Sequence, residues 1–138
     1  MQPSPPTSSD HPWGDADTPY LQLGGENPLK KLVESFYDIV EEESPVLRLM
    51  LPADTSNSRL KLFEFLSGWM GGPQLYLEKR GHPRLRMRHF PFTIGDDEAS
   101  EWIRCMEKAM DRNHISGEIR GFLVEKLTES ALHLRNKA

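Results

Sequence analysis

The sequence has a single cysteine among 138 residues, which limits the sites that it can form. A lone thiol, Cys105, cannot close an intramolecular disulfide and cannot supply the cysteine pair of a CxxC metal site. This cysteine usage is typical of a reducing compartment. No charge environment for a reactive thiolate is evident around Cys105, so we expect it to be a small buried hydrophobic residue.

Long hydrophobic runs are also missing. No stretch approaches the roughly 18 apolar residues that a bilayer span needs, and the mean hydropathy of −0.59 is that of a largely solvated chain. The first residues have neither the basic start nor the apolar stretch of a signal peptide. We therefore expect a cytoplasmic protein that has no membrane partner.

The chain has no excess of positive charge, with 17 Lys and Arg residues against 21 Asp and Glu residues and a net charge of −4. This balance gives no general basis for binding nucleic acid. Glycine-rich motifs for a flavin or nicotinamide nucleotide are absent, so a redox activity would need an external reductase. Strand-like alternation of apolar and polar residues is absent as well, which favours an all-α fold.

Proline is abundant at the N-terminus, where five prolines precede Tyr20. A segment of this composition cannot keep a helical hydrogen-bond ladder or bury much surface, so residues 1–20 are expected to be flexible. With the Gly24-Gly25 turn, this gives an arm over residues 1–25 and one domain over residues 26–138. The alternative is that Trp13 or Tyr20 folds back onto the domain.

Apolar residues recur at the three- and four-residue spacing of amphipathic helices in four longer segments. The first is opened by Pro28, which suits a first helical turn, and the second is ended by Gly71-Gly72-Pro73. The first expected helix covers residues 27–40, and a short helical turn follows at residues 46–51. The second helix is capped by Asp54, Ser56 or Asn57 and reaches Met70. The third runs from Asp96 or Asp97 to Met110, and the fourth follows residues 113–117 and reaches Leu134.

Residues 73–94 form a proline-bounded connector that is too long for a simple turn, and such loops in compact domains are usually functional. Within it, residues 78–90 carry five Lys and Arg residues against one glutamate. Two interpretations of this charge are open. It is either a solvated face paired with the acidic helices or a site for an anion.

The connector also contains two histidines. His89 is followed by Phe90 and Pro91, and a proline disfavours the helical conformation for the residue before it, so a helical turn that carries His89 must end there. A carbonyl at that end can accept a hydrogen bond from Nδ1–H and leave Nε2 for a metal. A hydrogen-bonded structural histidine is the alternative. His82 fits a surface or turn position.

An ordered series of residues runs through the connector and its neighbouring helices. Its members are Phe36-Tyr37, Gly71-Gly72-Pro73, Tyr76, Gly81-His82-Pro83-Arg84-Leu85-Arg86, Arg88-His89, Pro91-Phe92 and Trp102. This series resembles the group II truncated haemoglobins over about residues 27–135. The resemblance implies an all-α, globin-like 2-on-2 helical sandwich around a haem.

The resemblance also implies roles for individual residues around one haem b per chain. His89 would be the proximal ligand of the iron, and Tyr37 and Trp102 map onto the distal residues that donate hydrogen bonds to its ligand. The other implied positions are Leu51, Ser58 and Leu62, which would face the haem, and Lys61, Tyr76 and Arg88, which would contact its propionates.

Leu51 departs from the family pattern, because the family usually has an aromatic residue such as Tyr, Phe or His before this proline. Leucine removes a third distal donor and an aromatic wall. We therefore expect faster ligand release than in relatives with tyrosine there. The Ser58 hydroxyl either bonds ligand or water, or it bonds the backbone of its own helix.

The resemblance predicts a haem protein that reversibly binds O2 and other diatomic ligands such as CO and NO, for storage or oxygen transport. The alternative is a redox enzyme at the same site, for NO dioxygenation or peroxide detoxification with an external reductase. A third hypothesis, without haem, is a helical interaction module whose basic connector binds an acidic partner. A monomer and a homodimer are both compatible with the sequence.

Overall fold

The computed structural model describes residues 18–81 and 95–134 of the chain. Within these residues every regular element is an α-helix, as the absence of strand alternation predicted. The helices are α1 (Pro19–Leu23), α2 (Glu26–Glu43), α3 (Pro45–Arg48), α4 (Ser56–Trp69), α5 (Leu75–Arg80), α7 (Asp96–Arg112) and α8 (Gly117–His133).

The long helix α2 has one apolar face that is buried over its whole length. Phe36 and Ile39 on this face are at most 2% exposed. The helix ends at Ser44, whose hydroxyl accepts a hydrogen bond from the backbone N–H of Leu47 at 3.4 Å and so caps the following turn, α3. The buried residues of α2 are Leu29, Leu32, Val33, Phe36, Tyr37, Ile39 and Val40, all of which the periodicity had marked as apolar positions.

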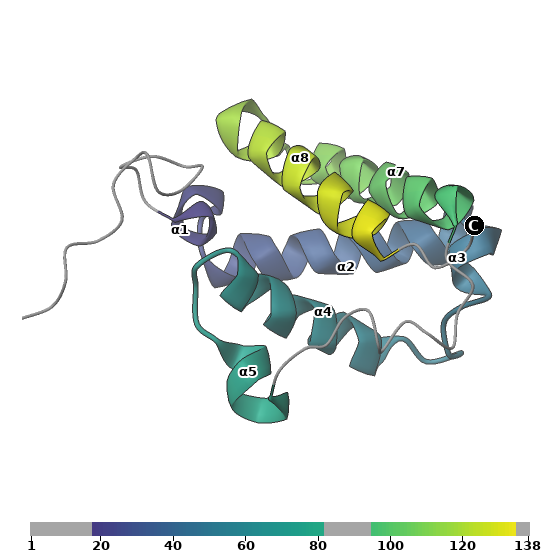
Figure 1. The fold of residues 1–138 in the computed structure, drawn as a ribbon, viewed down its shortest axis with the longest axis horizontal. Coiled ribbons are helices and arrows are strands. Elements are labelled where there is room, and N and C mark those ends of the chain that lie inside the picture. Colours follow the sequence, from purple (N-terminus) through teal and green to yellow (C-terminus); the bar gives the residue numbers. More distant parts are fainter. Residues whose placement is uncertain (1–17, 82–94, 135–138) are drawn as a thin grey trace, which may run out of the picture.

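The longer helices form two pairs (Figure 1). Helix α2 packs against α4 on one side and against α7 on the other, and α7 packs along α8. Helix α4 meets the α7–α8 pair through side chains, since the ring centroid of Trp69 lies 6.3 Å from that of Phe122 on α8. The pairs are therefore α2 with α4 and α7 with α8, and the contact between α2 and α7 joins them. This is the predicted two-over-two helical sandwich.

The start of the domain lies earlier than the sequence analysis predicted. Thr18 caps α1, Pro19 occupies its first turn, and the backbone N–H of Tyr20 donates to the carbonyl of Met70 at 2.9 Å. A Cβ at Gly72 would lie 2.5 Å from the Tyr20 ring, so glycine is needed for this close contact. Residues 18–25 therefore do not belong to the flexible arm that the sequence predicts. Residues 19–23 form a helix packed on the domain, because the Tyr20 ring packs against Gly72. Trp13 lies outside the described residues.

Helix α4 ends where the sequence predicted a break. Gly71 has a φ of +88°, which a residue with a side chain rarely adopts, and the Ser67 hydroxyl donates to the carbonyl of Pro73 at 2.7 Å. The connector then forms the short helix α5. None of the helices in the described part of the chain is long and apolar enough to cross a membrane.

Candidate functional site

Tyr37 occupies the centre of the candidate site. Its side chain is on the apolar face of α2 and is 9% exposed. Burial raises the pKa of the Tyr37 hydroxyl to about 12, although the nearby Arg59 charge acts in the opposite direction. Among the described residues, the hydroxyl is in no hydrogen bond. The site therefore contains a neutral, buried donor for which the described residues supply no acceptor.

Trp102 on α7 is brought close to Tyr37 through the ring of Phe36. The Phe36 ring centroid is 5.1 Å from that of Tyr37 and 5.0 Å from that of Trp102. Trp102 is half-buried, and its indole N–H has no hydrogen-bond partner within residues 18–81 and 95–134. The two expected distal donors thus flank one aromatic ring, although they come from helices 65 residues apart in the chain.

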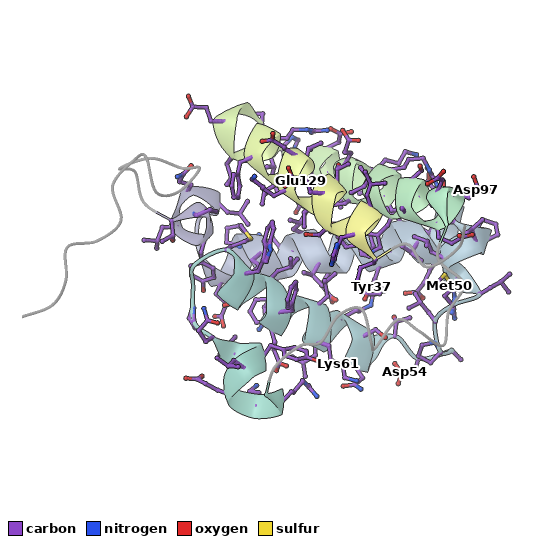
Figure 2. All side chains as sticks on the ribbon, in the orientation of Figure 1. Tyr37, Met50, Asp54, Lys61, Asp97 and Glu129 are labelled. Atoms are coloured by element: carbon purple, nitrogen blue, oxygen red, sulfur yellow. The ribbon has the colours of Figure 1, made fainter. Side chains whose placement is uncertain are left out.

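Several large apolar side chains on α4, α7, α8 and the turn before α4 are only half-buried. Figure 2 shows Tyr37 between α4 and the α7–α8 pair. A flat apolar group next to a buried donor suits this arrangement, because it would cover these side chains. The haem implied by the sequence therefore fits the residues present. The half-buried residues are Leu51, Leu62, Phe65, Trp69, Trp102 and Phe122, and Ser58 has similar exposure.

The residues expected at the haem edge are only partly described. Lys61 is half-buried on α4, where Figure 2 labels it. Tyr76 on α5 is buried, with its ring 6.3 Å from that of Phe65. Arg88 and His89 lie outside the described residues. The structure thus brings Lys61 and Tyr76 to neighbouring helices, and their propionate contacts stay a prediction.

Glu64 is a functional candidate that the sequence analysis missed. It is 0% exposed on α4, and its carboxylate accepts hydrogen bonds from Lys79 Nζ at 2.9 Å and Arg80 Nε at 2.8 Å. Two of the five cations of the basic connector are thus paired with an acidic residue of a helix, which agrees with the first of the two interpretations of this charge. The charge of Glu64 inside an otherwise apolar run was the available signal.

Arg59 is the second residue that the sequence analysis missed. It reaches from α4 to the carboxylates of Glu34, Asp38 and Glu41 on α2. The spacing of these three acidic residues, at i, i+4 and i+7, was a signal of one charged stripe. Nothing in the sequence pairs that stripe with an arginine on another helix.

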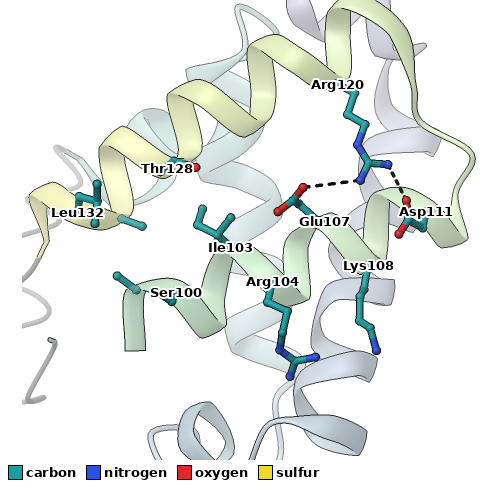
Figure 3. Close-up of a pocket in the computed structure, with 11 residues that line it drawn as sticks. Ser100, Ile103, Arg104, Glu107, Lys108, Asp111, Arg120, Thr128 and Leu132 are labelled. Atoms are coloured by element: carbon teal, nitrogen blue, oxygen red, sulfur yellow. Dashed lines mark hydrogen bonds and ion pairs between the residues drawn. The ribbon is translucent and has the colours of Figure 1, made fainter. Parts of the chain in front are cut away.

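A surface cavity of about 430 Å³ lies elsewhere, between α7 and α8 (Figure 3). Its three cations are each paired with carboxylates. Arg120, for example, lies 2.6 Å from Asp111 and 3.8 Å from Glu107, as the dashed lines show. Arg104 and Lys108 both pair with Glu43. This cavity is separate from Tyr37, and its charges are already balanced.

Cys105 behaves as the sequence predicted. It is 0% exposed on α7, and burial raises the pKa of its thiol. A thiol in this environment stays protonated near neutral pH, so the interpretation of Cys105 as a small buried hydrophobic residue is confirmed.

Comparison with known proteins gives consistent similarities. Residues 18–136 match the family of bacterial-like globins. The chain is 41% identical over 121 residues to the group 2 truncated hemoglobin YjbI of Bacillus subtilis, covering 88% of this chain and 90% of that protein. The crystal structure of the group II truncated hemoglobin from Bacillus anthracis has a TM-score of 0.86 at 41% identity, over 88% of this chain and 98% of that one. The truncated oxygen-avid haemoglobin from Bacillus subtilis has a TM-score of 0.83 at 42% identity, over 87% and 100%.

The family match begins at Thr18, the residue that caps α1, and it spans every described helix. The arrangement of the longer helices agrees with this match. Together these observations place the chain in the group II truncated haemoglobins, the two-on-two globins, whose general function is the binding of ligands at a haem.

Proposed function

We propose that this protein holds one haem b through His89 and reversibly binds O2, CO or NO beside Tyr37 and Trp102. The observation that carries the proposal is the buried Tyr37 hydroxyl, which has no hydrogen-bond partner among the described residues. A buried donor without a partner costs about 1–3 kcal/mol, and a bound diatomic ligand would accept its hydrogen bond. The haem supplies the iron at which such a ligand binds.

The remaining residues have simpler roles in this proposal. Lys61, Tyr76 and Arg88 hold the propionates, since cations and hydroxyl groups at the haem edge give charge-assisted hydrogen bonds. The apolar wall includes Leu51 and Leu62, which exclude water from the ligand. The half-buried position of these side chains supports this assignment.

Two donors beside one ligand favour tight binding. Each hydrogen bond to a partly anionic oxygen contributes about 1.5–3 kcal/mol, and every 1.4 kcal/mol changes affinity tenfold. The name of the Bacillus subtilis relative describes that protein as oxygen-avid, which agrees with this expectation. Leu51 acts in the opposite direction, because it supplies no third donor.

Tight binding also favours a second candidate function, which is chemistry on the ligand. A protein that releases O2 slowly is a poor carrier, whereas NO or peroxide can react before O2 leaves. In NO dioxygenation, O2, NO and one electron combine to give nitrate, so an external reductase must return the electron. Stopped-flow mixing of the oxygenated protein with NO tests this candidate, since formation of nitrate faster than O2 release would support it.

The proposed function is tested by O2 dissociation in Tyr37→Phe and Trp102→Phe variants. Loss of one donor should speed O2 release about tenfold or more, because one hydrogen bond of about 1.4 kcal/mol is removed. Tyr20→Phe is the matched control, since Tyr20 packs on the domain from α1, and it should leave the rate unchanged. Unchanged release in both distal variants would contradict the proposal.

A further inference from the structure

The Arg59 side chain is 19% exposed and contacts three carboxylates and one aromatic ring. Its Nη1 lies 3.0 Å from Asp38 Oδ1 and 3.2 Å from Glu34 Oε1, and its Nη2 donates to Glu41 Oε2. The guanidinium carbon is 5.6 Å from the centroid of the Tyr37 ring. One cation near the start of α4 therefore contacts both the acidic stripe of α2 and its aromatic donor.

The acidic stripe runs beside Tyr37 along α2. Glu34 precedes Tyr37 by three residues and Glu41 follows it by four, which are the two spacings that place side chains next to each other on a helix. Without Arg59, carboxylates on both sides of the ring would lack the cation that they share. A planar guanidinium suits this role, because it binds several oxygens at once while it lies against an aromatic ring.

Thr55 fixes the guanidinium from the other side. Arg59 Nε donates to Thr55 Oγ1 at 2.9 Å, and that hydroxyl donates to Glu41 Oε2 at 3.0 Å. Thr55 is 5% exposed, whereas the Glu41 side chain is 33% exposed, so this bridge is partly sheltered from water. The orientation of Arg59 is thus set by acceptors on both α2 and the turn before α4.

We propose that Arg59 is a positioning residue for ligand binding, which holds the Tyr37 ring in the orientation from which its hydroxyl donates to the ligand. This inference rests on the proposed function of Tyr37. Arg59 acts only through that ring and through the spacing of α2 and α4. The pKa of Tyr37 supports the contact, since the Arg59 charge lowers it against the effect of burial.

The first test is a double-mutant cycle on O2 dissociation with Arg59→Met and Tyr37→Phe. In the native background, Arg59→Met should speed O2 release about three- to tenfold, as coupled neighbours do. In the Tyr37→Phe background the same substitution should change the rate less than about twofold, because the donor is already gone. Arg59→Lys keeps the charge without the planar fork and should give an intermediate rate.

The second test measures the motion of the Tyr37 ring by NMR. The chain has three tyrosines, so carbon-13 labelling of tyrosine gives few NMR signals, and Tyr37→Phe assigns the one that belongs to Tyr37. In the CO-saturated protein, Arg59→Met should speed the flipping of this ring and shift the infrared stretching band of bound CO toward its value in Tyr37→Phe. Arg120→Met is the matched control, because Arg120 also binds two carboxylates but joins α8 to α7. It should change neither signal.

The outcomes separate the two proposals. If Tyr37→Phe alone leaves O2 release unchanged, the donor role of Tyr37 fails and the role of Arg59 fails with it. If Tyr37→Phe speeds release but Arg59→Met does not, or does so equally in both backgrounds, only the positioning role is overturned. Should Arg59→Met fail to fold, Arg59→Lys and Thr55→Val take its place in the same cycle, and unchanged Tyr37 ring flipping in both would overturn the proposal.

Discussion

Glu64 is a carboxylate that the fold takes completely out of water. Burial by itself would raise the pKa of Glu64, but hydrogen bonds from Lys79 and Arg80 outweigh this effect and hold the pKa below its usual value. The two cations are themselves 57% and 27% exposed, so they reach this acid from the surface. The ion pairs of Glu64 with Lys79 and Arg80 therefore join α4 to α5, the first helix of the connector.

Glu64→Gln is expected to destabilise the protein by about 1–3 kcal/mol, because the buried side chain loses its charge-assisted bonds to Lys79 and Arg80. The full penalty for breaking a buried ion pair does not apply, since both cations can turn to water. Urea unfolding at neutral pH measures the change. Glu129→Gln is the control, because Glu129 forms an exposed pair with Lys126 and should change stability by less than about 0.5 kcal/mol.

The effect of Glu64→Gln on stability is also expected to depend on pH. A carboxylate whose pKa is lowered by folding contributes stability above its unfolded pKa, about 4.3 for glutamate, and loses this contribution as pH falls further. The stability difference between the native protein and Glu64→Gln should therefore shrink below about pH 4. A difference that grew with acidity would mean that folding raises the pKa of Glu64.

At the scale of the element, α1 is too short to be stable as an isolated helix, so its contacts with the domain must hold it. Tyr20 provides them through its backbone bond to Met70 and its ring against Gly72.

We therefore expect that deletion of residues 1–17 leaves the melting temperature within a few degrees of the native value, whereas deletion of residues 1–25 costs about 1.5–3 kcal/mol for the lost burial of one large side chain. Thermal unfolding of the two truncated proteins measures this. Gly72→Ala provides a diagnostic, because its methyl group would meet the Tyr20 ring. Gly72→Ala should destabilise the full chain but not the protein that lacks residues 1–25. Equal effects in both proteins would contradict the docking of α1.

At the scale of the whole molecule, α2 packs against both α4 and α7 and so holds α4 beside the α7–α8 pair. The side chains between them stay half-buried, so the protein by itself leaves apolar surface uncovered. A haem in this position would contact both pairs and would bind the folded state in preference to the unfolded state.

Haem is thus expected to raise the melting temperature of the haem-free protein, with saturation at one haem per chain. At a hundred times its dissociation constant, a ligand stabilises the folded state by about 2.7 kcal/mol. His89→Ala should lose this stabilisation and the normal Soret band, because the iron loses its proximal ligand, whereas His82→Ala should keep both. Loss of haem in His82→Ala instead would move the iron ligand to His82.

Much of the architecture could be predicted from local sequence, because its signals act over a few residues. The apolar spacing of residues 27–40 marked the buried face of α2, and Gly71-Gly72-Pro73 marked the end of α4. Tyr37 and Trp102 were identified through the family resemblance, and the structure brings them together at Phe36. The sequence failed at α1, because proline content predicts flexibility only when no distant partner binds the segment.

The sequence by itself determined the all-α class, the boundaries of the four longer helices to within a few residues and the membership of the family, since these follow from periodicity, helix-ending residues and an ordered motif. Only the tertiary structure decided that Tyr20 docks at Gly72, that Glu64 is buried with Lys79 and Arg80, and that Arg59 lies over Tyr37. These contacts join residues 15 to 52 positions apart, and no local pattern selects one partner among the many charged and aromatic residues that the chain offers. Packing of whole helices makes that selection.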